Sequence, residues 1–205
     1  MNELMPFLQA TFGPLVLIFT VSNLGAMGLQ VKMPEVVAAL RNKKSIALIF
    51  VWGWVLGPLF GYLITRVLPL AEPYVVVVLL ASLAPCAPFI QQMVSKAGGD
   101  IGFAGALIPL VAVGTVVFMP VMAPLLIQGL TISVGALAKP LVLTILLPLV
   151  IGAAIRYRAD AVAVRIFPAV KGIAMLSTLL TIVWCLVIYG RGMLDTAGQY
   201  ALLAM

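Results

Sequence analysis

The chain has 205 residues, of which 64% are hydrophobic and only 9% are charged. A soluble domain carries about 25% charged residues, so we predict an all-α integral membrane protein, because helices satisfy their own backbone groups in lipid. The net charge of +6 lies in short segments between apolar stretches rather than along one face, which argues against nucleic acid as a partner.

Six apolar segments are each long enough to cross a bilayer, for which about 20 residues suffice. The start of the chain lacks the basic residues of a signal peptide, so the first segment is interpreted as a retained helix. All six belong to a single transmembrane domain, residues 1–205. The predicted spans are residues 6–29, 46–68, 73–95, 101–128, 137–155 and 171–190.

The loops between these spans divide their basic residues unevenly. If the N-terminus lies outside, nine lysines and arginines fall in inner loops and three in outer ones. This positive-inside bias predicts a protein of the cell (inner) membrane with its N-terminus outside. The first inner loop contains Met33-Pro34-Glu35, a helix-start signal, and we expect a short helix on the inner surface there.

Three glycines recur at four-residue spacing in the second predicted span. They are Gly53, Gly57 and Gly61, and Pro58 follows the middle one. Glycines on one helical face let another backbone approach closely. We therefore predict that these three residues serve helix packing.

The third predicted span is interrupted by Pro85 and Pro88, shortly before Gln91 and Gln92. Each proline lacks an N–H, so nearby carbonyls lose their helical partners, and such groups are tolerated at membrane depth only inside protein or beside a watery cavity. The amides of the two glutamines must also face protein or a cavity. We predict that Pro85, Cys86, Pro88, Gln91 and Gln92 line a path for substrate or ions. For the glutamines, hydrogen bonding between helices is the alternative.

The remaining residues argue against an enzyme. The chain has no histidine and two cysteines, Cys86 and Cys185, which excludes a histidine-ligated metal, a thiolate metal cage and a histidine-based triad. In the fourth predicted span, Thr115 is the only hydroxyl between Asp100 and Gln128. Because acids, bases and nucleophiles are not grouped within the spans, we expect no catalysis, no cofactor and no metal.

Taken in order, several motifs resemble the bile acid:sodium symporter family of the bile acid/arsenite transporter superfamily. The resemblance implies two inverted repeats, in which two broken helices cross at mid-membrane and a core bundle moves against a panel of helices. Residues 73–95 would form the first crossing helix. The second would lie beyond residue 205, so we expect a truncated or fragmentary member. The matching segments are Ala26-Met27-Gly28-Leu29, Gly57-Pro58, Ala84-Pro85-Cys86-Ala87-Pro88, Gly99-Asp100, Pro120 to Pro124 and Leu146-Leu147-Pro148-Leu149-Val150-Ile151-Gly152.

The sodium ligands of the family fall on mostly apolar positions of this chain. They correspond to Ile90, Gln91, Ala104, Ile108 and Gly53, of which only Gln91 is polar. A hard cation needs several oxygen ligands, so the sequence argues against sodium coupling and leaves proton coupling or facilitated transport open.

The leading hypothesis is a secondary transporter of a small organic anion that works by alternating access. Backbone N–H groups around residues 88–92 would face a carboxylate or sulfonate. Two alternatives remain: an arsenite or metalloid exporter, since Cys86 matches a cysteine of that branch while Met93 and Val94 do not match its following residues, and a non-transporting membrane scaffold. The expected partners are a small-molecule substrate and membrane lipid, and the sequence leaves the oligomeric state open.

Overall fold

A computed structural model of the whole chain describes residues 4–84, 94, 97–99, 101–127 and 133–203. All regular elements in these ranges are helices, which confirms the predicted all-α class. Five helical segments in them are long and apolar enough to cross a membrane, and the chain is an integral membrane protein. These segments are Pro6–Gln30, Ile46–Val67, Leu107–Leu126, Val134–Arg158 and Asp160–Gly190.

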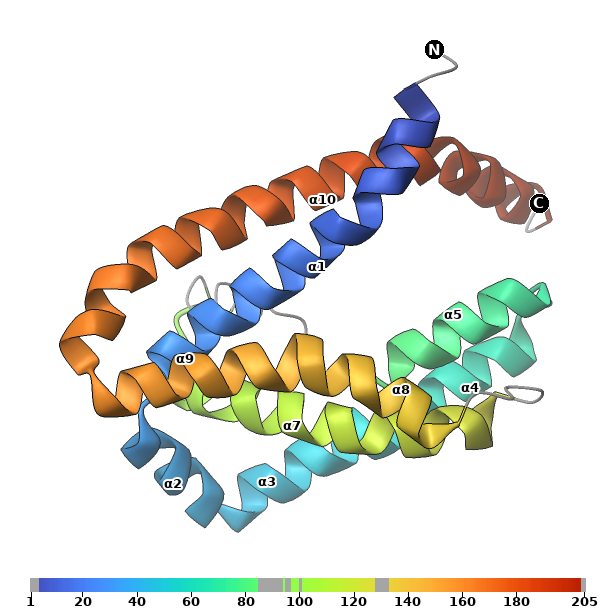
Figure 1. Cartoon of the computed structure of the whole chain (residues 1–205). Helices are drawn as coiled ribbons and strands as arrows, with labels where there is room; N and C mark the ends of the chain where they lie inside the picture. Colours follow the sequence, from blue (N-terminus) through green and yellow to red (C-terminus); the bar gives the residue numbers. More distant parts are fainter. Residues whose placement is uncertain (1–3, 85–93, 95–96, 100, 128–132, 204–205) are drawn as a thin grey trace.

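Figure 1 shows the helices of the described residues. In chain order they are α1 (Leu4–Gln30), α2 (Met33–Arg41), α3 (Lys43–Phe50), the π-helix η1 (Val51–Leu56), α4 (Gly57–Val67), α5 (Glu72–Ser82), α7 (Ile101–Leu126), α8 (Val134–Leu141), the π-helix η2 (Val142–Leu146), α9 (Leu147–Arg158) and α10 (Asp160–Leu203).

Two of the predicted spans look different in the structure. The third is described only as α5 with Leu83 and Ala84 behind it, because residues 85–93 lie outside the described ranges. The last is part of the longer helix α10, which is separated from α9 by Ala159 alone. Arg158 at the end of α9 and Asp160 at the start of α10 each complement the helix dipole, which favours helix on both sides of this turn.

A π-helix precedes each of two buried prolines, Pro58 and Pro148. The residue just before each proline donates its N–H across five residues, from Gly57 to the carbonyl of Trp52 and from Leu147 to that of Val142. A proline cannot donate the normal helical hydrogen bond, so the bonding pattern must change locally. The wider turn lets both helices continue past their prolines.

The long helices form two groups. In the first group, α1 runs along α10 and crosses α9; in the second group, α4 contacts α5, and α5 contacts α7 (Figure 1). A cluster of Leu24 and Met27 of α1, Ile108 of α7 and Leu149 of α9 joins the groups. Helix α7 therefore links the two groups.

The crossing of α1 and α9 is a contact between backbones. A Cβ atom on Gly28 would collide with the carbonyl oxygen of Leu149 and would lie 2.9 Å from the backbone nitrogen of Ala153. A Cβ atom on Gly152 would lie 2.6 Å from the carbonyl oxygen of Gly25. Only glycine fits at Gly28 and Gly152, because even one methyl group would separate the helices.

We predict that Gly28→Ala destabilises the protein by about 1–3 kcal/mol, the usual cost of overpacking. Gly13→Ala in the same helix is the matched control, because a Cβ atom there meets nothing within 4 Å and alanine favours helix. Thermal unfolding of the detergent-purified variants measures the difference. Equal melting temperatures for the two variants would show that the crossing is looser than described.

Candidate functional site

The five residues predicted to line the path, Pro85, Cys86, Pro88, Gln91 and Gln92, lie outside the described residues. The structure instead describes the two segments of the chain that flank them. One is the end of α5, and the other is a turn before α7.

The end of α5 is tightened as it approaches Pro85. The N–H of Leu83 donates to the carbonyls of Leu79 and Leu80, at 3.3 and 3.2 Å, and the N–H of Ala84 donates to that of Ala81 at 3.2 Å. Bonds over three residues are typical of the last turn of a helix. The residue before a proline is also disfavoured in helical conformation, so local sequence and structure agree on an end here.

The end of α5 is held from one side by α4. A Cβ atom on Gly61 would lie 2.5 Å from the Cβ of Ser82, and one on Gly57 would lie 3.1 Å from the Ser82 carbonyl oxygen. Both glycines therefore lie against the last turn of α5. Gly53 is half-buried in η1. The packing role of all three glycines stays a prediction, and the geometry at Gly57 and Gly61 supports it.

From the other side, α5 is held by the end of α7. Leu79 and Leu83, of which Leu83 is fully buried, pack against Ala123 and Ile127. Leu83, two residues before Pro85, thus lies in a well-packed apolar environment, while Ala84 is exposed. This packing fixes where the chain enters the predicted break.

The segment that leads from the break to α7 ends in a glycine turn. Gly98 has a positive φ of 69°, and the N–H of Gly99 donates to the carbonyl of Val94 at 2.9 Å. A bond across five residues with glycine in the left-handed conformation is the Schellman motif of a helix C-terminus. Gly98 and Gly99 are exposed, and Asp100, which with Gly99 forms one of the segments that resemble the family, lies outside the described residues.

Two described residues of α7 bear on sodium binding. Ile108, at a position where the resemblance implies a hydroxyl ligand, is buried against Leu24, Met27 and Leu149. The hydroxyl of Thr115 donates to the carbonyl of Val111 at 2.9 Å within the same helix. Ile108 has no oxygen to offer a hard cation, whereas the buried hydroxyl of Thr115 uses its hydrogen within the helix and keeps its oxygen lone pairs.

A row of polar contacts between α1 and α10 was not anticipated from the sequence. The hydroxyls of Ser22 and Ser177 lie 3.3 Å apart, and the amide nitrogen of Asn23 donates to the hydroxyl of Thr178 at 3.2 Å and to the carbonyl of Ala174 at 3.4 Å. We call these five residues the polar seam. Adjacent polar residues in both the first and the last predicted span were the available signal.

The polar seam joins helices, and its hydrogen-bond donors are engaged. The amide nitrogen of Asn23 also donates to the carbonyl of Phe19, and the hydroxyls of Ser177 and Thr178 donate to the carbonyl of Ala174. Further along the same pair of helices, the indole N–H of Trp184 donates to the hydroxyl of Thr11 at 3.1 Å. Hydrogen bonds of this kind stabilise contacts between membrane helices.

The bonds of the polar seam predict a measurable coupling between Asn23 and Thr178. In a double-mutant cycle of Asn23→Ala and Thr178→Ala, we expect a coupling free energy of roughly 0.6–1.7 kcal/mol, the range found for such bonds in membranes. Denaturant unfolding of the four proteins gives this value.

Thr20→Ala provides the matched control for this cycle. Its hydroxyl donates to the carbonyl of Val16 in its own helix, so it should show no coupling to Thr178→Ala. Equal coupling in both cycles would mean that the hydrogen bond between Asn23 and Thr178 is not the cause.

Comparison with known proteins gives one family. The model of the Sodium Bile acid symporter family matches residues 14–195, nearly the whole chain. No individual curated protein matches significantly. The match begins in α1 and ends in α10, so it includes both helix groups and the predicted break.

Proposed function

The chain belongs to the sodium bile acid symporter family, and from this we propose a secondary transporter that moves a small organic anion by alternating access. Members of this family are membrane transporters. The observation that carries the mechanism is the apolar contact between two groups of helices. One cluster around Ile108 and Leu149 joins them, and at a second cluster Leu137 of α8, which continues into α9, packs near Ala123 and Ile127.

In this proposal the first group, α1, α9 and α10, is the panel, and the second group, α4, α5 and α7, belongs to the core. Each group is held together by specific contacts. The panel has the glycine crossing and the polar seam, and the core has the contact of Gly57 and Gly61 with Ser82 and the packing of α5 on α7. Such contacts favour groups that move as rigid units.

Both clusters that join the two groups are apolar. Apolar contacts have no preferred direction, so surfaces of this kind can shift against each other without breaking hydrogen bonds. Alternating access needs such a surface between two rigid groups. The contrast between bonding within the panel and apolar contact across the two clusters therefore supports the proposal.

We place the translocation path at residues 85–92, next to the end of α5. Carbonyls freed by Pro85 and Pro88 and the amides of Gln91 and Gln92 would offer polar groups to the substrate, with Cys86 beside them. Backbone N–H groups at a helix start would favour a carboxylate or sulfonate. The packing around Leu83 supports this position, because it holds one end of the break firmly.

The proposed orientation has the N-terminus outside the cell (inner) membrane. Helix α2 and the turn between α9 and α10 lie at one end of the molecule, and the connection of α4 to α5 lies at the other (Figure 1). Lys32, Arg41 and Arg156 line one pocket at the first of these ends. A concentration of basic residues at one end is what the positive-inside rule expects of the inner side.

The proposed path predicts different effects for Gln91→Ala and Gly57→Leu in the full-length protein. Gln91→Ala should lower transport about tenfold or more, since it removes a hydrogen bond to a charged substrate, and should leave stability nearly unchanged. Gly57→Leu should instead lower stability by about 1–3 kcal/mol, because it adds bulk against Ser82. Uptake into proteoliposomes and thermal unfolding separate the two effects. Normal uptake by Gln91→Ala would refute the proposed path, and no uptake by the unmodified protein would favour a scaffold.

Transport should depend only weakly on sodium. Ile90, Ala104 and Ile108 stand where sodium-coupled relatives are expected to place ligands, and Ile108 is buried among apolar side chains. The initial uptake rate should therefore be largely kept when potassium or choline replaces sodium at fixed pH. The same assay across a pH gradient tests proton coupling. Near-complete loss of uptake without sodium would contradict this prediction and show that transport is coupled to sodium.

A further inference from the structure

A pocket of about 760 Å³ lies between α2, along its whole length, and the turn from α9 to α10. Its walls come from both sides of this junction, and its polar lining residues are Lys32, Glu35, Arg41, Arg156, Tyr157 and Asp160. Helices with membrane-spanning segments end or begin here, at Gln30, Arg158 and Asp160. The pocket therefore lies at the membrane surface rather than at its centre.

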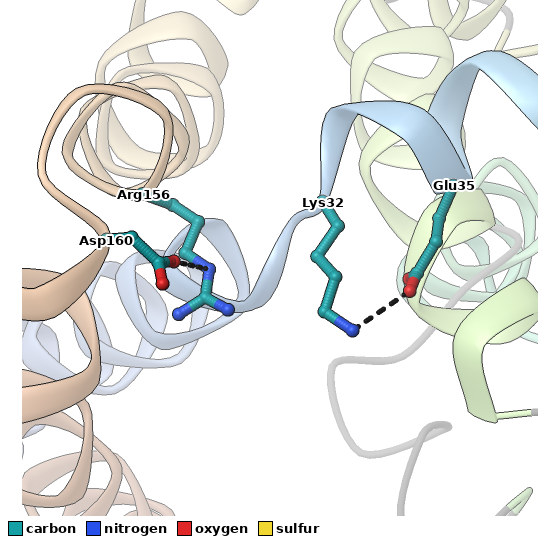
Figure 2. A network of polar contacts seen from close by, with 4 residues as sticks. All are labelled: Lys32, Glu35, Arg156 and Asp160. Atoms are coloured by element: carbon teal, nitrogen blue, oxygen red, sulfur yellow. Dashed lines mark hydrogen bonds and ion pairs between the residues drawn. The ribbon is translucent and has the colours of Figure 1, made fainter.

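Two ion pairs face each other across this junction (Figure 2). The Nζ of Lys32 lies 3.1 Å from Oε1 of Glu35, and the Nε of Arg156 lies 3.0 Å from Oδ1 of Asp160. Arg41 adds a third cation, so three positive and two negative side chains leave the lining with a net charge of +1. The pocket favours an anion.

The pair of Lys32 and Glu35 can exchange partners at low cost. The side chains of Lys32 and Glu35 are 57% and 40% exposed, and pairs this exposed contribute only about 0–1 kcal/mol. Lys32 can therefore turn to another anion. The guanidinium of Arg156 uses Nε for Asp160, and its geometry provides further N–H donors in the same plane.

The rest of the pocket is apolar and partly exposed. Met33 and Val37 of α2 line it, with 41% and 48% of their surfaces accessible. Leu40 of α2 is also exposed, and α2 ends in the charged residue Arg41. A short helix with exposed apolar residues and a cationic end, placed where spans meet water, fits the boundary between headgroups and acyl chains.

We propose that this pocket binds the headgroup of an anionic phospholipid. Lys32, Arg41 and Arg156 hold the phosphate, while Met33 and Val37 contact the glycerol and the first part of the acyl chains. Basic pockets between membrane helices are suited to such headgroups, and the apolar wall distinguishes a lipid from a free phosphate of the same charge. The bound lipid joins α2 to the turn between α9 and α10, independently of any transported substrate.

Native mass spectrometry of the full-length protein tests this site. The purified protein is titrated in detergent with phosphatidylglycerol or phosphatidylcholine, and bound lipids are counted. We expect one phosphatidylglycerol to bind at the lowest lipid concentrations and phosphatidylcholine to bind at least tenfold more weakly, because it is zwitterionic. Glycerol 3-phosphate in excess should not displace the lipid. Displacement by glycerol 3-phosphate, or equal binding of both lipids, would overturn the proposal.

Variants separate a specific site from general attraction to charge. Arg41→Gln and Arg156→Gln should each lower the affinity for the first bound phosphatidylglycerol roughly tenfold, since each removes charge-assisted hydrogen bonds. Arg158→Gln is the matched control, because Arg158 is an exposed arginine of the same helix end that does not line the pocket. It should change the affinity by less than about fivefold, the effect of one charge near the surface. Equal losses in all three variants would refute the site, and melting temperatures in phosphatidylcholine verify folding.

Discussion

Close contact between two backbones, at the crossing of α1 with α9, is the constraint on which the first helix group depends. Lipid tails are as apolar as leucine, so the hydrophobic effect does not drive helices together inside a bilayer. Association must come from dispersion contacts at short range and from hydrogen bonds. Gly28 and Gly152 allow the close dispersion contacts, and the polar seam supplies the hydrogen bonds. Under the proposed orientation, the glycine crossing and the polar seam both involve the inner half of α1. In its outer half, Thr11 and Phe12 contact α10.

Several prolines lie inside α-helices, and two further pairs differ from these in their surroundings; the prolines inside α-helices are Pro14, Pro109, Pro120, Pro124, Pro140 and Pro168. Pro58 and Pro148 follow π-helices and leave their spans continuous, because the residue before each finds a carbonyl five positions back. Pro85 and Pro88 instead follow a helix end at Leu83 that is sealed by apolar packing. A proline alone therefore does not define a break in a membrane helix. Its surroundings decide whether the chain bends around it or ends before it.

The sequence predicted the helical class, the membrane location and the family, since these follow from apolar length and from ordered motifs such as Gly57-Pro58. It did not predict which helices are neighbours. Most spans are apolar all round, so periodicity carries little information about the face that meets protein. Asn23 and Thr178 are polar residues inside spans and therefore need partners, but the sequence does not show that they pair with each other. The beginning of α10 at Asp160 was missed because basic residues such as Arg165 were interpreted as a loop. The predicted path at residues 85–92 lies outside the described residues. Only the contacts of the segments on either side, the end of α5 and the turn at Gly98, bear on it.

The polar seam has a consequence for how the chain is made. Asn23 and Thr178 are 155 residues apart, so α1 enters the bilayer long before its partner has been synthesised. During that interval an amide without a partner would disfavour insertion. Another bond of Asn23, to the carbonyl of Phe19 at 2.8 Å, lies within α1 and needs no other helix. Asn23 can thus cross the membrane with its amide partly satisfied and acquire Thr178 only when α10 arrives.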